Sequence, residues 1–107
     1  MRRDIFQALA DPTRRAIILL LTTQVLTPNN IAEHFNITRQ AVSKHLILLA
    51  ECDVLRQEQK GREIYYHLNS HKMKELEAYL AEFKKLMSTK FDQLDNVLLK
   101  LKSNKIK

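Results

Sequence analysis

The chain has 107 residues, of which 45% are hydrophobic, and it carries a formal net charge of +6 at pH 7. This length allows one domain with one modest core and excludes a multidomain enzyme. One Gly and two Pro, in a sequence rich in good helix formers, predict a mainly helical fold with little strand. The single cysteine, Cys52, excludes an intramolecular disulfide and fits a reducing compartment.

The positive charge is distributed unevenly along the chain. Residues 1–69 hold nine Lys and Arg against seven Asp and Glu, whereas four lysines stand within residues 100–107. A polyanionic partner must therefore be argued from local arrangement rather than from the net charge. The apolar run at residues 16–26 is too short to span a membrane, and no cleavable apolar segment begins the chain, so we expect a cytoplasmic protein.

The first helix is expected over residues 3–9. Its apolar side chains share one face at helical spacing: Ile5, Phe6 and Leu9. We expect this face to contribute to a dimer interface.

The second helix is expected over residues 12–22. Asp11 can cap it, and Pro12 occupies the first helical position, where a missing N–H group costs nothing. Arg14 and Arg15 follow this helix start. Their guanidinium groups either contact DNA phosphates or only solvate the helix.

A very short helix, a tight connection and a longer helix come next. After a break around Pro28, either Asn29 or Asn30 caps a helix that ends near Phe35. Thr38 is then placed to cap the following helix. This succession predicts a helix-turn-helix.

The helix within residues 37–50, ITRQAVSKHLILLA, carries two patterns. One side holds residues that would pack on a core: Ala41, Val42, Leu46 and Leu49. The other side holds long or hydrogen-bonding side chains: Arg39, Gln40, Ser43 and Lys44. Those four are either ordinary solvated residues or an edge that forms hydrogen bonds to a partner.

The pattern changes from helix to strand at Val54. Residues 54–59 and 63–68 are β-compatible runs on either side of Gly61, the only glycine, in a turn where a positive φ is commonly needed. This predicts a two-stranded hairpin, which must pack on the helices because a lone hairpin is marginally stable. Its expected contacts are the apolar residues Leu55, Ile64, Tyr66 and Leu68.

The last helix is expected over residues 70–102, capped by Asn69 or Ser70. Its apolar residues fall on heptad a and d positions, with Lys90 as the polar exception and Phe91 beside it. They are Met73, Leu76, Leu80, Phe83, Met87, Leu94, Val97 and Leu101.

Such a helix would be about 50 Å long, whereas the globule formed by the preceding residues would be only about 28 to 30 Å across. The apolar stripe beyond the globule needs a cover, either a second copy of the chain or a fold-back at residues 87–90. No Gly or Pro marks a turn there, so we favour a homodimer. The expected interface combines both terminal helices: Ile5, Phe6, Leu9, Leu76, Leu80, Phe83, Met87, Phe91, Leu94 and Leu98.

Three segments resemble the signature blocks of the ArsR-type bacterial repressors. They are FQALADPTRRAIILLL at residues 6–21, ITRQAVSKHLILLAECDVL at 37–55 and KGREIYYHLN at 60–69. The resemblance implies a winged helix-turn-helix DNA-binding domain over residues 1–69 and a dimerisation helix with a basic tail over residues 70–107. It further implies a homodimeric repressor on a pseudo-palindromic operator, with residues 37–50 in the major groove and the hairpin as a wing along the backbone.

The residue types agree with DNA binding. Gln can bond adenine bidentately, Arg and Lys can reach guanine or phosphate, and Ser can serve either. Lys60 and Arg62 flank the hairpin glycine, where long cations either meet phosphates or enter the minor groove, although turns are often simply charged. Arg56 has an ambiguous strand face. His45 either reaches phosphate or bonds within the fold. The predicted DNA-binding residues are Thr38, Arg39, Gln40, Ser43, Lys44, His45, Arg56, Lys60 and Arg62.

One position departs from the family pattern. Relatives commonly have Gly where the recognition helix ends, whereas this chain has Asp53, which adopts a left-handed conformation at some cost. Cys52 beside it is expected to pack at the helix end rather than to act as a redox sensor, because no neighbouring Lys or Arg would lower its pKa.

Many relatives sense metals through paired Cys or through Asp and His sets. Residues 29–36 contain no Cys, and His71 has no His or Asp partner at ligand spacing, so the resemblance points to the branch that does not sense metals. No metal or cofactor is expected. The remaining alternative is a dimer-bridging site formed by His34, His67 or His71.

No catalytic motif is present: there is no phosphate-binding Gly loop, no nucleophile elbow and no suggestive Cys and His pair. The chain is therefore predicted not to be an enzyme. The alternative to a DNA-binding repressor is a winged-helix interaction module that recruits a protein through its long helix and never reads bases.

Overall fold

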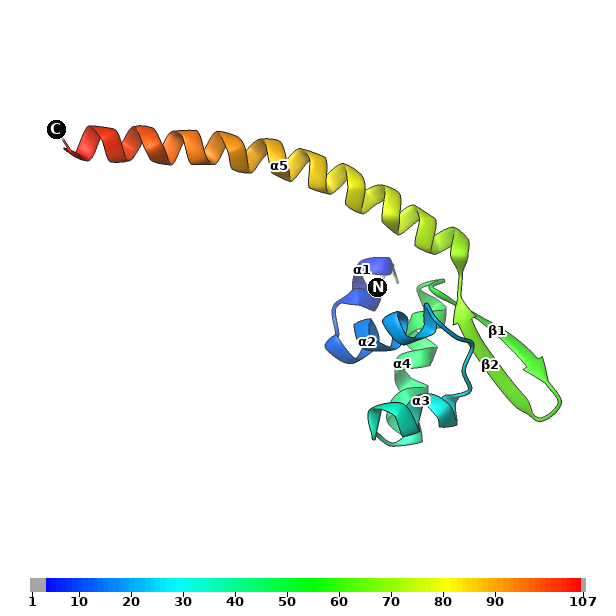
Figure 1. The fold of residues 1–107 in the computed structure, drawn as a ribbon. Helices are drawn as coiled ribbons and strands as arrows, with labels where there is room; N and C mark the ends of the chain where they lie inside the picture. The colour runs from blue at the N-terminus through cyan, green and yellow to red at the C-terminus, as the bar shows by residue number, and fades with distance from the viewer. Residues whose placement is uncertain (1–3, 107) are drawn as a thin grey trace. The chain divides into compact units, whose positions relative to one another are not determined.

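The computed structural model describes the backbone of residues 4–106 and the side chains of residues 4–103. These residues form a mainly α fold with one β-hairpin, as predicted (Figure 1). The chain divides into two compact units that meet at Met73 and Lys74, inside the last helix. In chain order the elements are α1 (Ile5–Leu9), α2 (Pro12–Leu21), α3 (Pro28–Phe35), α4 (Arg39–Glu51), β1 (Leu55–Lys60), β2 (Glu63–Leu68) and α5 (Ser70–Ile106).

Helix α1 begins two residues later than predicted. Asp4 is extended, with φ −134°, and its Oδ1 accepts hydrogen bonds from the backbone N–H groups of Phe6 and Gln7, each at 3.1 Å. An N-cap is not itself helical, so the helix starts at Ile5. The predicted first residue, Arg3, lies outside the described residues.

The start of α2 confirms its predicted cap. Asp11 Oδ2 accepts from the backbone N–H of Arg14 at 3.0 Å, and Pro12 stands at the first helical position. The helix ends at Leu21 instead of Thr22, which is its C-cap.

The predicted cap of α3 was wrong. Thr27, not an asparagine, accepts the backbone N–H of Asn30 at 3.2 Å, and Pro28 is the first helical residue. Proline suits that position because its φ is already helical and its missing N–H would have no partner. The helix ends at Phe35, and its C-cap, Asn36, adopts the left-handed conformation, φ 54°. The N–H of Ile37 then donates a hydrogen bond to Ala32 O at 3.2 Å.

Helix α4 follows after one further residue. Thr38 caps it as predicted, since its Oγ1 accepts the Ala41 N–H at 3.1 Å. At the other end Asp53 is left-handed, φ 62°, and the N–H of Val54 bonds Leu49 O at 3.0 Å. This is a Schellman closure in which Asp takes the place that Gly usually fills, as the sequence predicts.

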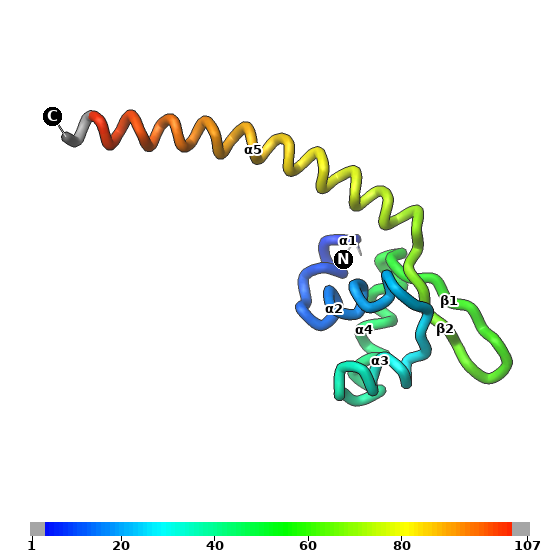
Figure 2. The backbone as a smooth tube through the Cα atoms, in the orientation of Figure 1, coloured from blue at the N-terminus to red at the C-terminus, as the bar shows by residue number. Residues whose placement is uncertain are grey.

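The hairpin turns at Gly61 as predicted (Figure 2). Leu55 pairs with Leu68 and Lys60 with Glu63, which leaves a two-residue turn in which Gly61 has φ 64°. Antiparallel partners share a face, so the face of Leu55, Tyr66 and Leu68 packs on the helices. Ile64 does not join this contact as expected, because it lies near the turn and is 39% exposed.

A contact that the sequence did not predict attaches the hairpin to the helix-turn-helix. Leu26, in the segment between α2 and α3, forms an isolated antiparallel bridge with Tyr66 of β2. The N–H of Leu26 donates to Tyr66 O at 3.1 Å, and the N–H of Tyr66 donates to Leu26 O at 2.7 Å. The bridge holds β2 beside the start of α3 and so sets the position of the wing.

The core of the first unit joins all four short helices to β1. Its buried members are Ala8, Ile17, Ile18, Leu21, Ile31, Val42, Leu46, Leu49, Cys52, Val54 and Leu55. Val42, Leu46 and Leu49 confirm the predicted inward side of α4, and Cys52 is buried at its end as expected.

Helix α5 is continuous through residues 87–90, so the fold-back alternative was wrong, and it extends past Lys102 to Ile106 (Figures 1 and 2). Asn69 caps its start: the side-chain Oδ1 accepts the His71 N–H at 3.2 Å. Within residues 4–106 no helix has the length and apolarity needed to span a membrane. Of the second unit's large apolar residues, those about half exposed or more are Tyr79, Leu80, Phe83, Leu86, Phe91, Leu94, Val97, Leu98, Leu99 and Leu101.

Candidate nucleic-acid interface

The first turns of α4 present the polar residues that the sequence singled out. Thr38, Arg39, Gln40 and Lys44 are exposed, and Ser43 is half-buried between them. A hollow in the surface is lined by Arg39, Gln40 and Ser43. The inward side of the helix packs on the core, so the backbone of α4 is held while this polar edge faces outward.

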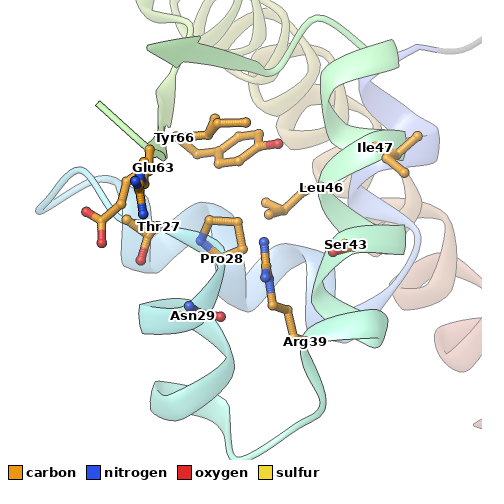
Figure 3. A pocket seen from close by; sticks show the side chains of 11 residues that line it. Thr27, Pro28, Asn29, Arg39, Ser43, Leu46, Ile47, Glu63 and Tyr66 are labelled. Carbon is orange, nitrogen blue, oxygen red and sulfur yellow. The ribbon is translucent and has the colours of Figure 1, made fainter. Parts of the chain in front are cut away.

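A groove of about 330 Å³ lies between the start of α3, helix α4 and strand β2 (Figure 3). Three predicted DNA-binding residues line it: Arg39 and Ser43 from α4, and Arg62 from the hairpin turn. In Figure 3 the Arg39 side chain extends from the start of α4 toward Pro28. The fold thus brings a cation of α4 and a cation of the hairpin turn, 23 residues apart in sequence, to one groove.

The rest of the groove was not predicted from the sequence. Its lining also includes Thr27, Pro28, Asn29, Leu46, Ile47, Glu63, Ile64 and Tyr66. The bridge between Leu26 and Tyr66 explains how α3 and β2 come to line one groove, because it joins the residue before Thr27 to the middle of β2. No local pattern encodes such a pairing.

The strand pairing resolves which face Arg56 occupies. It pairs with His67 on the face opposite Leu55, and its guanidinium lies 3.8 Å from the Asp53 carboxylate. Lys60 shares that face with Arg56. Both cations therefore lie on the side of the wing that faces away from the core, whereas Arg62 lines the groove.

Arg14 and Arg15 have a role that neither alternative included. The Arg14 guanidinium donates to Ala8 O at 3.2 Å and Gln7 O at 2.9 Å, and Arg15 donates to Leu9 O at 2.6 Å. These carbonyls belong to the last turn of α1. The two arginines therefore hold α1 against the start of α2.

His45 is half-buried on α4 and lies near the cap of α2. The Arg14 backbone N–H that bonds Asp11 is the main reason that the pKa of this carboxyl falls below its ordinary value, and the charges of His45 and Arg14 lower it further. On the hairpin, the hydrogen bond from Tyr65 Oη to Glu63 Oε2, 2.8 Å long, raises the pKa of Tyr65.

Sequence reasoning also missed an apolar residue on the polar side of α4. Ile47 is 59% exposed and stands four residues after Ser43 and three after Lys44. Residues at these spacings are neighbours on a helix surface. Its place beside the predicted contacts could have been found by continuing the helical spacing by one turn.

The predicted dimer residues fall into two groups. Ile5 and Leu9 of α1 pack against the core of their own unit, whereas Phe6 is 48% exposed. On α5, Leu76 and Met87 are half-buried. The remaining predicted residues of α5 are about half exposed or more: Leu80, Phe83, Phe91, Leu94 and Leu98.

The histidines of the alternative metal site were also located. The ring of His34 packs edge-on against Phe35, with centroids 4.9 Å apart, and His67 Nδ1 lies 3.2 Å from Leu68 O. In the part of the chain that the structure describes, no three His, Cys, Asp or Glu residues are grouped so that they could hold a metal ion.

The helix-turn-helix, its hairpin wing and the outward polar edge of α4 define a winged helix-turn-helix protein. Residues 9–58 match a helix-turn-helix domain family. The chain is 45% identical over 67 residues to the transcriptional repressor SdpR of Bacillus subtilis, a match that covers 63% of this chain and 74% of that protein. It is 41% identical over 66 residues to the HTH-type transcriptional regulator CmtR of Mycobacterium tuberculosis, covering 61% of this chain and 56% of that protein.

A crystal structure of an ArsR family transcriptional regulator superposes with a TM-score of 0.66 at 33% identity, covering 78% of this chain and 87% of that one. The chain belongs to the ArsR family of helix-turn-helix transcriptional regulators. It is a DNA-binding regulator of transcription, and members of this family are not enzymes.

Proposed function

We propose that the protein is a homodimeric repressor that acts in the cytoplasm and binds a pseudo-palindromic operator through α4 and the wing. The observation that carries this proposal is the convergence of Arg39, Ser43 and Arg62 on one groove beside the exposed Gln40 and Lys44. Bound at a promoter, such a protein would exclude RNA polymerase. The similarity to a protein named as a transcriptional repressor supports this direction of control.

The residues divide by the chemistry they offer to DNA. Gln40 carries an amide that can bond adenine bidentately, and Arg39 and Lys44 can reach guanine or phosphate. Lys60, Arg62 and the other wing cations would contact the backbone, which positions the protein without reading sequence. Thr38, His45 and Arg56 remain proposed contacts, and Ser43 can bond either a base or a phosphate.

A dimer would form through α5. The proposed interface residues of this helix repeat every 11 residues and not every seven, as the heptad pattern predicted. This spacing of about 3.67 residues per turn keeps a stripe on one face of a nearly straight helix. They are Leu76, Leu80, Phe83, Met87, Phe91, Leu94 and Leu98. A second copy would cover this stripe, and Phe6 of α1 is proposed to add to the interface. The two α4 helices would then need to lie about 34 Å apart to enter successive major grooves.

We propose no metal in this function, although one similar structure is described as a cadmium metal-sensor from Mycobacterium tuberculosis. That structure is 37% identical, with a TM-score of 0.56, and covers 69% of this chain. Cys52 is buried as the C-cap of α4, and a lone thiolate would not make a site.

The test is a selection from a pool of random duplexes with the purified full chain. An enriched pseudo-palindrome is expected, and the logarithm of its affinity should fall steeply with the logarithm of salt concentration. If no sequence is enriched, the repressor proposal fails and the interaction-module alternative gains.

Two variants separate the roles of helix and wing. Gln40→Ala should relax base preference at one position of each half-site, and Lys60→Ala should weaken all duplexes alike and reduce the salt slope by about 1 per protomer. Gln24→Ala and Lys85→Ala, exposed residues outside the proposed contacts, are the matched controls. Equal loss of base preference in Lys60→Ala would contradict the assignment.

A further inference from the structure

Ile47 is an exposed apolar residue on the outward side of α4, and the proposed function leaves its chemistry unused. It is 59% exposed, while its neighbours on the same side, Gln40, Ser43 and Lys44, are polar. It continues their row by one helical turn, because position 47 is four residues after 43 and seven after 40.

Packing within the chain does not account for an isoleucine there. Val42, Leu46 and Leu49 already supply the buried side of α4, and each is at most 1% exposed. A β-branched side chain loses rotamer freedom in a helix, so an isoleucine that stays 59% exposed lowers helix propensity and gains only partial burial in return. A partner that buries this side of α4 would supply the missing contact.

The chemistry of the major groove indicates which group on DNA would make that contact. Each base pair presents donors and acceptors there, and the thymine C5-methyl is the one apolar group on those base edges. Gln40, Ser43 and Lys44 can use the donors and acceptors, but an aliphatic side chain can use only the methyl group. Ile47 borders the groove lined by Arg39 and Arg62, so DNA held by these cations would pass beside it.

We infer that Ile47 is a specificity-determining residue that recognises the C5-methyl group of one thymine in each operator half-site. This inference rests on the proposed function, since it requires α4 to enter the major groove. It adds an apolar element to a recognition surface that otherwise reads DNA by hydrogen bonds.

The experiment removes the methyl group and keeps the base pair. Each thymine of the selected operator is replaced in turn by deoxyuridine, and affinity is measured by fluorescence anisotropy at constant salt. For the wild-type protein, replacing one particular thymine of a half-site should lower operator affinity about fourfold, the change expected for one buried methyl group. Its symmetry mate in the other half-site should behave in the same way. When this thymine is replaced in both half-sites together, the loss of affinity should reach about 15-fold.

The variants assign that methyl group to Ile47. Ile47→Ala should bind the thymine and deoxyuridine duplexes equally, and Ile47→Val, which keeps a branched aliphatic side chain, should retain part of the difference. Leu19→Ala removes an aliphatic side chain of α2 that is 69% exposed; this control should retain the whole difference in affinity. Circular dichroism verifies that each variant is folded.

The possible failures are distinct. If a sequence is selected but no deoxyuridine substitution weakens the wild type, the thymine contact is wrong while the repressor proposal stands. If the deoxyuridine effect persists in Ile47→Ala, another residue reads the methyl group. If no sequence is selected at all, both proposals are overturned.

Discussion

Helices α4 and α5 each carry apolar residues, yet they bury them very differently. In α4 the apolar side is packed inside its own unit, with Leu49 fully buried. In α5 the apolar residues beyond Met73 stay largely exposed, with Leu80 and Leu98 close to half exposed. Because α4 packs on the core of its own unit, its opposite side faces outward, where we propose DNA contact. Because the apolar residues of α5 are exposed, we propose that their stripe is a surface for a second copy.

The largest effect, on dimerisation and operator affinity, is expected when the apolar stripe of α5 is disrupted. Leu80→Asp with Leu94→Asp places two charges in the apolar stripe, so the dimer should dissociate at micromolar concentration. Operator affinity should then fall at least about 100-fold, because two linked half-site contacts become independent. Thr89→Asp with Asn96→Asp adds the same charge to the opposite side of the helix and should remain dimeric. Analytical ultracentrifugation measures both, and a monomeric wild type would contradict the idea.

The next variant tests how much the buried side of α4 contributes to the free energy of unfolding. Leu49→Ala should lower the free energy of unfolding by about 2 to 5 kcal/mol, because it removes a fully buried side chain and leaves a cavity. In the monomeric background, Leu98→Ala on α5 should change it by less than about 0.5 kcal/mol. Urea denaturation followed by circular dichroism gives both values, and similar losses would show that the two helices are not held differently.

Asn69 forms hydrogen bonds to the turn after α4 and to the start of α5, so a variant at this position tests their junction. Its side chain is 5% exposed, accepts the His71 N–H, and donates from Nδ2 to Asp53 O at 2.9 Å. Asn69→Asp keeps the cap but faces the Asp53 carbonyl with a second acceptor, so stability should fall by about 1 to 3 kcal/mol. Ser70→Ala, the exposed neighbour, should stay within about 0.5 kcal/mol in the same denaturation assay.

The smallest effect is expected at the turn after α4. Asp53 has φ 62°, a conformation that Gly adopts without strain, so Asp53→Gly should raise stability by about 0.5 to 1 kcal/mol. Loss of the exposed contact with Arg56 would subtract little from this gain. Asp53→Ala keeps the strain without a polar side chain and should be destabilising. Thermal unfolding should therefore rank Gly above the wild type and Ala below it.

Sequence reasoning predicted the order of elements because each depends on local chemistry. Asp11 and Thr38 were recognised as caps, Asn69 was one of two candidates, and Gly61 was recognised as the turn, since a cap or a positive φ concerns only a few consecutive residues. The errors were also local. Thr27 was overlooked because two asparagines followed it, although Pro28 at a first helical position made the preceding residue the cap.

The candidate site was predicted by residue type, and less well by position. Arg39, Ser43 and Arg62 were named from the sequence, and they do line one groove. Arg14 was misjudged because the carbonyls that it binds belong to another helix, and Ile47 was missed because an apolar residue was not sought on a polar side.

By itself the sequence determined which segments are helices, where the hairpin turns, and that one side of α4 is polar, because caps, prolines, glycine and periodicity act over a few residues. Tertiary structure alone decided that Leu26 pairs with Tyr66, that Arg14 closes α1, and which cations meet in the groove. Those contacts join residues far apart in the chain, so their geometry depends on how the core packs and not on any local preference.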